Sequence, residues 1–182
     1  MIDADGYRLN IGIILVSKEG RVFWAKRVGQ NAWQFPQGGV KPHETPKQAM
    51  FRELHEEIGL TPKQVHVAGA TKGWLRYRLP SHLIRYYQKP LCIGQKQIWY
   101  MLHLLGNEEE VRLDASDQPE FEDWKWVDYW YPTSQVIFFK RKVYETALKE
   151  LEPLAERKQE TVLVRRSVQR TGVRKIMVRR TV

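Results

Sequence analysis

The chain has 182 residues, 42% of them hydrophobic, and a formal net charge of +9 at pH 7. This length suits a single domain with its own core, and the one cysteine, Cys92, excludes an intramolecular disulfide and a zinc site built from cysteines. No apolar run reaches the roughly 20 residues of a transmembrane helix, and the first segment, MIDADGYRLN, is too acidic and polar for a secretory signal. We therefore expect a soluble cytoplasmic protein without membrane contact.

The positive charge is concentrated at the C-terminal end. Residues 157–182 contain nine Lys or Arg and one acid, a net of +8, so residues 1–156 carry only +1. We expect a folded domain over 1–156 and a basic tail over 157–182. Such a tail either stays disordered and aids solubility or binds a polyanion.

The first predicted elements are two strands. The β-branched run at 11–16, the turn SKEG and the segment 21–26 indicate a hairpin. Because residues 9–16 are almost all apolar, the first strand should be buried at the centre of a sheet. Pro36 and the two glycines of the following segment, WQFPQGG, indicate a loop.

A helix of about four turns is predicted after this loop. Thr45 suits its N-cap, Pro46 its first position and Gln48 the third position of a capping box. Gly59 suits the C-terminal stop. The apolar stripe of this helix consists of Met50, Leu54 and Ile58.

Three further strands and a last helix complete the prediction. The strands cover 65–70, 96–105 and 124–127, and the helix runs from about 134 to 154 with Val136 on its apolar face. Strands interleaved with two helices indicate a mixed α/β domain.

The first predicted helix carries a cluster of carboxylates. Glu53, Glu56 and Glu57 are related as i, i+3 and i+4, so they project from one face, away from the apolar stripe. Grouped carboxylate oxygens suit Mg²⁺ or Mn²⁺. Arg52 is placed to brace Glu56, and Glu44 is placed to brace Arg52 in turn.

Two glycines just upstream give this cluster a functional context. Gly38 and Gly39 precede the helix, where glycine lets the backbone approach a ligand closely. From Gly38 to Leu60 the order is Gly, five residues, Glu44, seven residues, Arg-Glu-Leu, one residue, Glu-Glu, one residue, Gly-Leu. This spacing resembles the box of the Nudix hydrolase family without a departure.

The resemblance implies an α/β/α sandwich and a metal-dependent hydrolase that cleaves a diphosphate bond in a nucleoside diphosphate linked to another moiety. Divalent cations would relieve the repulsion among the clustered glutamates, neutralise the charge of the substrate's phosphates and activate a bound water. Glu53 and Glu56 are both candidates for the general base. The implied metal-binding groups of the box are Glu53, Glu56, Glu57 and Gly38, and the implied structural residues are Gly38, Glu44, Arg52 and Gly59.

Segments outside the box resemble the bacterial RNA pyrophosphohydrolases. The likeness runs to about residue 151 and includes KPLCIGQKQIWY, PEFEDWKWVDYWYP and QVIFFKRKVYE. It implies removal of pyrophosphate or phosphate from the 5′-triphosphate or diphosphate end of RNA, which leaves a 5′-monophosphate and opens the transcript to decay. It also implies that Glu120, expected in a loop, is a further metal ligand or the base.

Polar and aromatic residues elsewhere are candidates for binding the RNA end. Arg8 and Arg27 are the first candidates, because a guanidinium can bind phosphate through two hydrogen bonds or stack on a base. Aromatic rings interleaved with positive charge, as in WLRYRLP and IFFKR, suit single-stranded RNA, although one of Phe138 and Phe139 should face the core. The other candidates are Gln34, Gln37, Lys41, Tyr77, Gln95 and Lys96, and, by resemblance, a base cleft of Ile137, Phe139 and Lys140.

Other functions stay open on the sequence. A dinucleoside polyphosphate hydrolase of the Ap4A type would use the same metal site, and both substrates could be shared by one enzyme. An inactive Nudix domain that binds RNA, or a structural protein, would have no need of the crowded carboxylates. A protein activator is not readable from the sequence.

Overall fold

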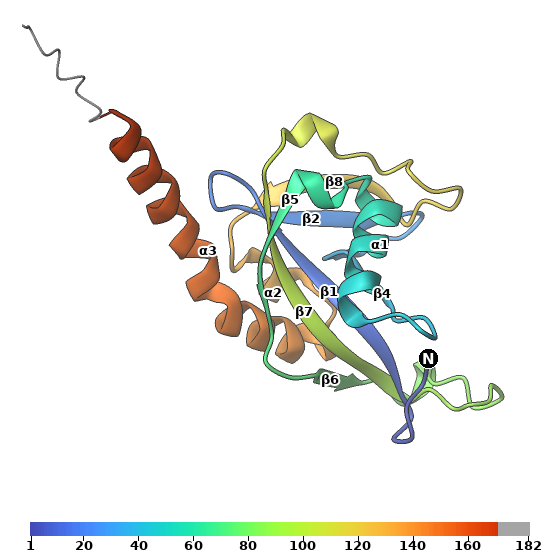
Figure 1. Cartoon of the computed structure of the whole chain (residues 1–182). Helices are drawn as coiled ribbons and strands as arrows, with labels where there is room; N and C mark the ends of the chain where they lie inside the picture. Colours follow the sequence, from blue (N-terminus) through green and yellow to red (C-terminus); the bar gives the residue numbers. More distant parts are fainter. Residues whose placement is uncertain (171–182) are drawn as a thin grey trace, which may run out of the picture.

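The computed structural model describes the backbone of residues 1–170 and the side chains of residues 1–155. One mixed sheet lies between helices on its two faces, which makes the expected α/β/α sandwich (Figure 1). The helices are α1 (Pro46–Ile58), α2 (Tyr131–Gln135) and α3 (Arg141–Arg170). The strands are β1 (Tyr7–Val16), β2 (Val22–Arg27), β3 (Trp33–Gln34), β4 (Gln37–Gly39), β5 (Val65–Ala70), β6 (Leu75–Arg78), β7 (Gly94–Leu104) and β8 (Phe121–Val127).

Strand β1 forms the centre of the sheet. It pairs in parallel with β7, from Tyr7 opposite Gly94 to Val16 opposite His103, and antiparallel with β2 and β4. Strands β5 and β6 pair with β7, while β3 and β8 pair with β2. Residues 10–16 of β1 are buried, which confirms the predicted central strand.

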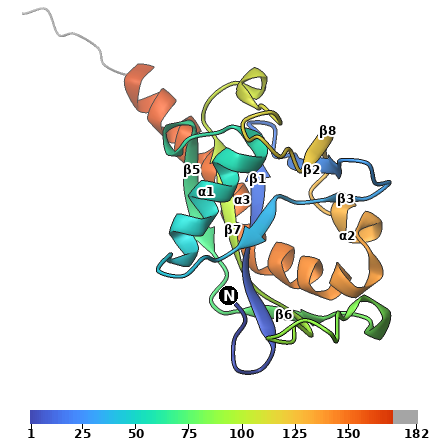
Figure 2. The ribbon, with the colours of Figure 1, turned by 90° about the vertical axis from the view of Figure 1, so that its right-hand side faces the viewer.

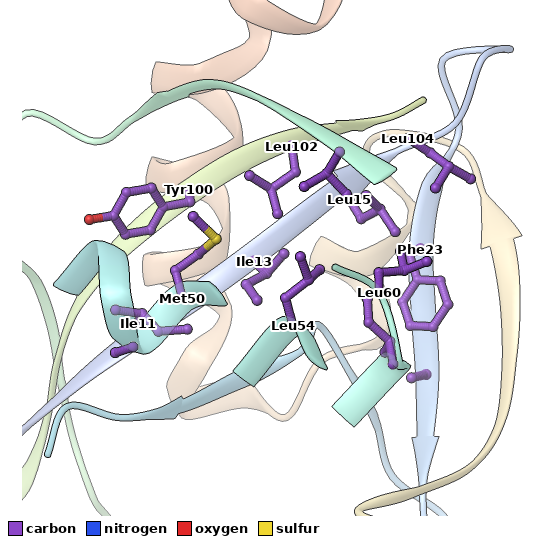
Figure 3. Close-up of a cluster of buried hydrophobic side chains, with 14 of the residues drawn as sticks. Ile11, Ile13, Leu15, Phe23, Met50, Leu54, Leu60, Tyr100, Leu102 and Leu104 are labelled. Atoms are coloured by element: carbon purple, nitrogen blue, oxygen red, sulfur yellow. The ribbon is translucent and has the colours of Figure 1, made fainter. Parts of the chain in front are cut away.

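Helix α1 covers one face of the sheet through the predicted apolar stripe. Met50 and Leu54 are fully buried and pack against Ile13 and Leu15 of β1 (Figure 3). The capping box at Thr45 is present, and the helix ends at Gly59 with φ at 71°. This left-handed conformation favours glycine. The bounds and orientation of α1 therefore follow the sequence prediction.

Helix α3 covers the opposite face through an aromatic cluster. Tyr144 of α3 is fully buried, and its ring centroid lies 4.9 Å from that of Trp99 and 5.3 Å from that of Phe35. Trp24 stands edge-on to Phe35 and Tyr144. Such edge and offset geometries are those that aromatic pairs prefer, so α3 is anchored to β2, to β7 and to Phe35 between β3 and β4.

The predicted loop around Pro36 is wrong in part, because it contains two short strands. Gly38 and Gly39 lie in β4 and pair with Ile11 and Asn10 of β1. The N–H of Ile13 donates to the carbonyl of Pro36 at 2.8 Å. Strand β4 supplies partners for one edge of β1, and this pairing holds the glycines beside α1.

The predicted last helix begins too early. Helix α2 ends at Gln135, Val136 and Ile137 are extended, and a 3₁₀ turn from Phe138 to Lys140 precedes α3. Val136 is nevertheless buried in the core beneath α3. The apolar spacing indicates burial correctly, but an extended segment buries Val136 as well as a helix would. Strand β6 was not predicted.

The backbone of α3 continues past the expected domain boundary at residue 156 and reaches Arg170. The rest of the predicted basic tail, residues 171–182, lies outside the described residues. In the part of the chain that the structure describes, no helix is long and apolar enough to cross a membrane.

Candidate active site

Arg52 of α1 holds the acidic cluster together. Its Nε and Nη2 donate to the two carboxylate oxygens of Glu44 at 2.8 and 2.9 Å, and its Nη1 donates to Glu53 Oε1 at 2.7 Å and Glu56 Oε2 at 2.9 Å. Nη2 also donates to the carbonyl of Gly39 at 2.8 Å. The guanidinium holds the pKa of the Glu44 carboxyl below its usual value. The bracing expected of Arg52 and Glu44 is therefore present.

The three clustered carboxylates have different environments. Glu53 and Glu57 are buried, whereas the side chain of Glu56 is 43% exposed. Glu57 Oε2 accepts a hydrogen bond from the backbone N–H of Gln37 at 2.9 Å, but its Oε1 is buried without a hydrogen-bond partner. Burial raises the pKa of Glu57 well above its usual value, and the charges of Glu120 and Glu53 raise it further. Burial also raises the pKa of Glu53.

Glu120 approaches this pair from the bend that precedes β8. Its carboxyl group interacts with that of Glu57, and its carbonyl accepts a hydrogen bond from the N–H of Val28 at 3.0 Å. That bond anchors the bend next to the end of β2. Glu120 thus stands beside the acidic helix, where a loop carboxylate was expected, and its role in the reaction stays a prediction.

Gly38 lies directly against the carboxyl group of Glu53. A Cβ at this position would be 1.8 Å from Glu53 Cδ, so no larger residue fits without moving that carboxylate. The close approach explains in physical terms why glycine occupies this place in β4.

The donor set suits a divalent cation. Glu57 Oε1 is an unpartnered buried oxygen, and the repulsion among Glu53, Glu57 and Glu120 is of the kind that a hard cation relieves. Among the described residues, no group of three or more His, Cys, Asp or Glu side chains is already arranged to hold a metal ion. Arg52 takes up one oxygen each of Glu53 and Glu56. The residues fit the cation in chemistry, and the role of each ligand stays a prediction.

A cavity of about 360 Å³ opens beside these carboxylates. Most of the predicted site residues line it together. They are Arg8, Arg27, Gln34, Gln37, Gly38, Glu53, Tyr77, Gln95, Glu120, Phe139 and Lys140, and the lining is completed by Asn10, Gly39 and Leu79. Glu56 and Glu57 do not belong to this lining.

Strand register explains how distant residues come to share this cavity. Arg8 of β1 and Tyr77 of β6 both stand opposite Gln95 of β7. Residues directly opposite on paired strands point to the same face of the sheet. The three side chains therefore form one row at the end of the sheet. Lys96, one residue further, points to the other face and forms an ion pair with Asp3 at 3.2 Å.

Two cationic side chains of the cavity, Lys140 and Arg27, lack a carboxylate as hydrogen-bond partner for their buried nitrogens among the described residues. Lys140 Nζ donates to Gln34 Oε1 at 3.1 Å, and burial together with the charge of Arg27 lowers the pKa of Lys140 to about 8. Arg27 Nε is buried without a hydrogen-bond partner. Donors of this kind are available to an anionic ligand. The arrangement can bind phosphate oxygens through Arg27 and Lys140 and hold a cation through the carboxylates.

Five side-chain amides form a network beside the cavity, and the sequence analysis named three of them. The Nε2 of Gln97, which is fully buried, lies 3.3 Å from both Gln37 Oε1 and Gln95 Oε1. Asn10 Nδ2 donates to Gln95 Oε1 at 3.2 Å, and Gln37 Nε2 donates to Gln34 Oε1 at 3.5 Å. Polar residues inside otherwise apolar strands were the signal that would have identified Asn10 and Gln97.

The predicted aromatic cleft is only partly formed. Phe139 packs on the core beneath α3 and lines the cavity, with its ring centroid 5.7 Å from that of Tyr77. Tyr77 is buried, so it is not open sheet surface. Phe138 is 67% exposed and Ile137 is 50% exposed, and neither belongs to the cavity lining. Lys41 also lies outside the lining, with its Nζ 3.8 Å from Glu56 Oε1.

A comparison with protein-family models identifies the family to which this fold and site belong. The family described as NUDIX domain matches residues 6–152. The chain belongs to the Nudix family, whose hydrolases generally use divalent metal ions.

Two relatives show how far the similarity extends. A protein of Alkalilimnicola ehrlichii named RNA pyrophosphohydrolase is 62% identical over 154 residues, which cover 85% of each chain. A protein of the same name from a Marinomonas species is 59% identical over 160 residues, covering 88% of this chain and 99% of the relative. Among solved structures, the E. coli dihydroneopterin triphosphate pyrophosphohydrolase is similar in fold, with a TM-score of 0.61, 22% identity and coverage of 77% of this chain and 95% of its own.

Proposed function

We propose that this chain is a metal-dependent Nudix pyrophosphohydrolase that acts on the 5′ end of RNA. It removes pyrophosphate from a triphosphate end, or phosphate from a diphosphate end, and leaves a 5′-monophosphate that starts decay of the transcript. The observation that carries the proposal is the cavity that Glu53 and Glu120 share with Arg8, Arg27 and Lys140. The relatives named RNA pyrophosphohydrolase support the choice of substrate.

We propose Mg²⁺ or Mn²⁺ as the cation. Bound there, it would neutralise phosphate charge and lower the pKa of a bound water. The groups that would hold it are Glu53, Glu56, Glu57, Glu120 and the backbone of Gly38. A carboxylate of Glu53, Glu56 or Glu120 takes the proton of the attacking water. Of these three, only Glu120 makes no hydrogen bond to Arg52 within the described residues.

The chain's own residues bind and orient the RNA end. Arg8, Arg27 and Lys140 bind phosphate oxygens through charge-assisted hydrogen bonds. Phe139 and Tyr77 provide aromatic walls for a base. The amide network sets the positions of Gln37 and Gln95, and Ile137 contacts the base from the rim. The proposed site of this reaction is the cytoplasm, where a single unpaired cysteine stays reduced.

The test is release of phosphate or pyrophosphate from 5′-end-labelled RNA with and without Mg²⁺ or Mn²⁺. The unmodified chain should act only with the cation. Glu53→Gln should lose most of the activity, whereas Glu145→Gln, an exposed acid on α3, should keep it. No release with either cation, or unchanged turnover in Glu53→Gln, would overturn the proposal. A larger kcat/KM on Ap4A than on RNA would make the dinucleoside polyphosphate the main substrate.

A further inference from the structure

Positive charge in the body of the protein is segregated along the chain. Residues 58–107 contain no acid and seven Lys or Arg, a net of +7. Because residues 1–156 carry +1 altogether, the rest of the body carries −6. The acid-free stretch contains β5, β6 and β7, which form one side of the sheet, and the loop that joins β6 to β7. The loop that joins β6 to β7 therefore belongs to a stretch of chain that carries cations and no acid of its own.

The loop between β6 and β7 exposes two aromatic rings at its tip. Tyr86 is 61% exposed and Tyr87 is 80% exposed. The flanking Arg85 and Lys89 are exposed as well and form no ion pair within the described residues. The rings lie on a hydrogen-bonded turn, in which the N–H of Gln88 donates to the carbonyl of Arg85 at 3.0 Å. We call Arg85, Tyr86, Tyr87 and Lys89 the loop patch.

This loop begins and ends at the active-site cavity. Tyr77 and Leu79 line the cavity just before the loop, and Gln95 lines it just after. A hydrogen bond of 2.9 Å from the N–H of Leu79 to the carbonyl of Ile93 closes the base of the loop. Figure 2 shows the loop, in green, at the same end of the molecule as the start of α3. The base of the loop is therefore adjacent to the cavity.

We propose that the loop patch binds nucleotides of single-stranded RNA downstream of the 5′ end held in the cavity. This inference rests on the proposed function. Exposed rings beside cations match the way proteins hold single strands without reading their sequence, by stacking bases and neutralising phosphates. The loop patch carries two cations and no acid, and neither cation forms an ion pair within the described residues, which favours an anionic partner. The loop patch therefore extends the substrate site and sets how tightly longer RNA is held.

The test compares short and long RNA in the full-length chain. Arg85→Ala/Lys89→Ala removes the charge of the loop patch, and Tyr86→Ala/Tyr87→Ala removes its rings. Lys18→Ala/Lys149→Ala is the matched control, because it removes two exposed cations outside the loop and outside residues 58–107. The substrates are a 5′-triphosphate trinucleotide and an unstructured RNA of about 20 nucleotides, a length that exceeds the usual site size of a single-strand binding fold. Binding is measured without divalent cation, and hydrolysis with it.

On the long RNA, the tyrosine variant should raise Kd roughly tenfold, which is within the range for loss of one or two stacked bases. The Arg85/Lys89 variant should reduce the salt slope of binding by about 1.4, because each phosphate contact to a single strand contributes about 0.7. Hydrolysis of the trinucleotide should be unchanged in both variants. The control variant should match the unmodified chain. On RNA made abasic from the fourth nucleotide onward, the tyrosine variant should bind as the unmodified chain does.

Three results would overturn the inference. The first is unchanged affinity and salt slope in both loop variants on long RNA, which would point to a protein as the occupant of this surface. The second is an equal loss on short and long RNA, which would make the loop part of the active site. The third is a tyrosine-dependent loss that persists on abasic RNA. Failure of the unmodified chain to hydrolyse the trinucleotide would instead overturn the proposed function, so the two outcomes are distinguishable.

Discussion

Helix α1 and the segment leading into α3 lie on opposite faces of the same sheet, and each supplies one part of the cavity (Figure 1). On the α1 side the core is largely aliphatic, and the functional groups are carboxylates from a single helix. On the α3 side the core is richer in aromatic rings, and the functional groups of the adjoining 3₁₀ turn are Phe139 and Lys140. The carboxylates of α1 are neighbours in one helix, whereas the cations of the cavity come from β1, β2 and this turn.

The two sides also differ in how their charges are compensated. Arg52 makes five hydrogen bonds and holds Glu44, Glu53 and Glu56 together. The ammonium of Lys140 has a neutral amide as its hydrogen-bond partner, and its pKa falls to about 8. Arg52 thus compensates Glu44, Glu53 and Glu56 within the protein, whereas the described hydrogen bond of Lys140 goes to a neutral amide. Removal of Arg52 should therefore lower stability, and removal of the charge of Lys140 should raise it.

The largest effect is expected from Glu53→Gln on the acidic side. We expect kcat to fall at least roughly 100-fold, the upper range for groups that only support a metal ligand. The fold should persist, because the carboxylate face is distinct from the apolar face that packs on β1. The fall in kcat is checked by steady-state hydrolysis of 5′-triphosphate RNA at saturating Mg²⁺. The persistence of the fold is checked by a melting curve. Near-normal turnover would remove Glu53 from the set of metal ligands.

Arg52→Ala tests the compensation on the same side. It leaves Glu44 and Glu53 without their common partner, and the loss from a partly buried charge network should be about 2–3 kcal/mol. For a domain of this size the melting temperature should fall by about 5–10 °C, with a loss of activity as well. The melting temperature and activity of Arg52→Lys should lie between those of the unmodified chain and those of Arg52→Ala. A single ammonium cannot reproduce the planar set of donors by which the guanidinium bridges several carboxylates. An unchanged melting temperature in Arg52→Ala would show that the network contributes nothing to stability.

Lys140→Met tests the cationic side of the cavity. It should raise the melting temperature, whereas Arg52→Ala should lower it. A lysine whose pKa falls from 10.5 unfolded to about 8 folded destabilises the protein below pH 8. This penalty, at most about 3 kcal/mol, fades as pH rises through 8 towards 10.5. The variant should therefore melt higher than the unmodified chain at pH 7, by a margin that shrinks at pH 9.5. Its kcat/KM on RNA should be roughly tenfold lower, as for loss of a charged hydrogen bond. A margin independent of pH would contradict the assignment of the buried charge.

The smallest effect is expected from deletion of residues 157–182. Leu151 of α3 is buried, and the half-buried Leu154 and Ala155 still pack on the core. The deletion spares these contacts, so hydrolysis of a trinucleotide should stay within about twofold, which is well below the effect of one contact. Affinity for long RNA should weaken, with a shallower salt slope, because the deleted segment carries +8. Equal losses on short and long RNA would show that residues 1–156 are not a complete catalytic unit.

The sequence by itself determined α1 and its acidic face. The capping box at Thr45, the stop at Gly59 and the i, i+3, i+4 spacing of the glutamates all act within about four turns. The strands predicted at 9–16, 65–70 and 96–105 correspond to β1, β5 and β7. Apolar runs indicate the burial of β1 and β7, whereas most of β5 is only half-buried. Such determinants are local, so they can be read without knowing what the chain packs against.

Only the tertiary structure decided which polar residues enter the cavity. Arg8 and Gln95 line it and Lys96 does not, because the register between β1 and β7 sets which side chains share a face. Phe139 enters and Ile137 stays at the rim, because the chain reaches α3 through an extended segment and a 3₁₀ turn. The register of β1 on β7 pairs residues 87 positions apart, such as Arg8 and Gln95, and Lys140 meets Gln34 from 106 positions away. No local pattern in the chain records such contacts.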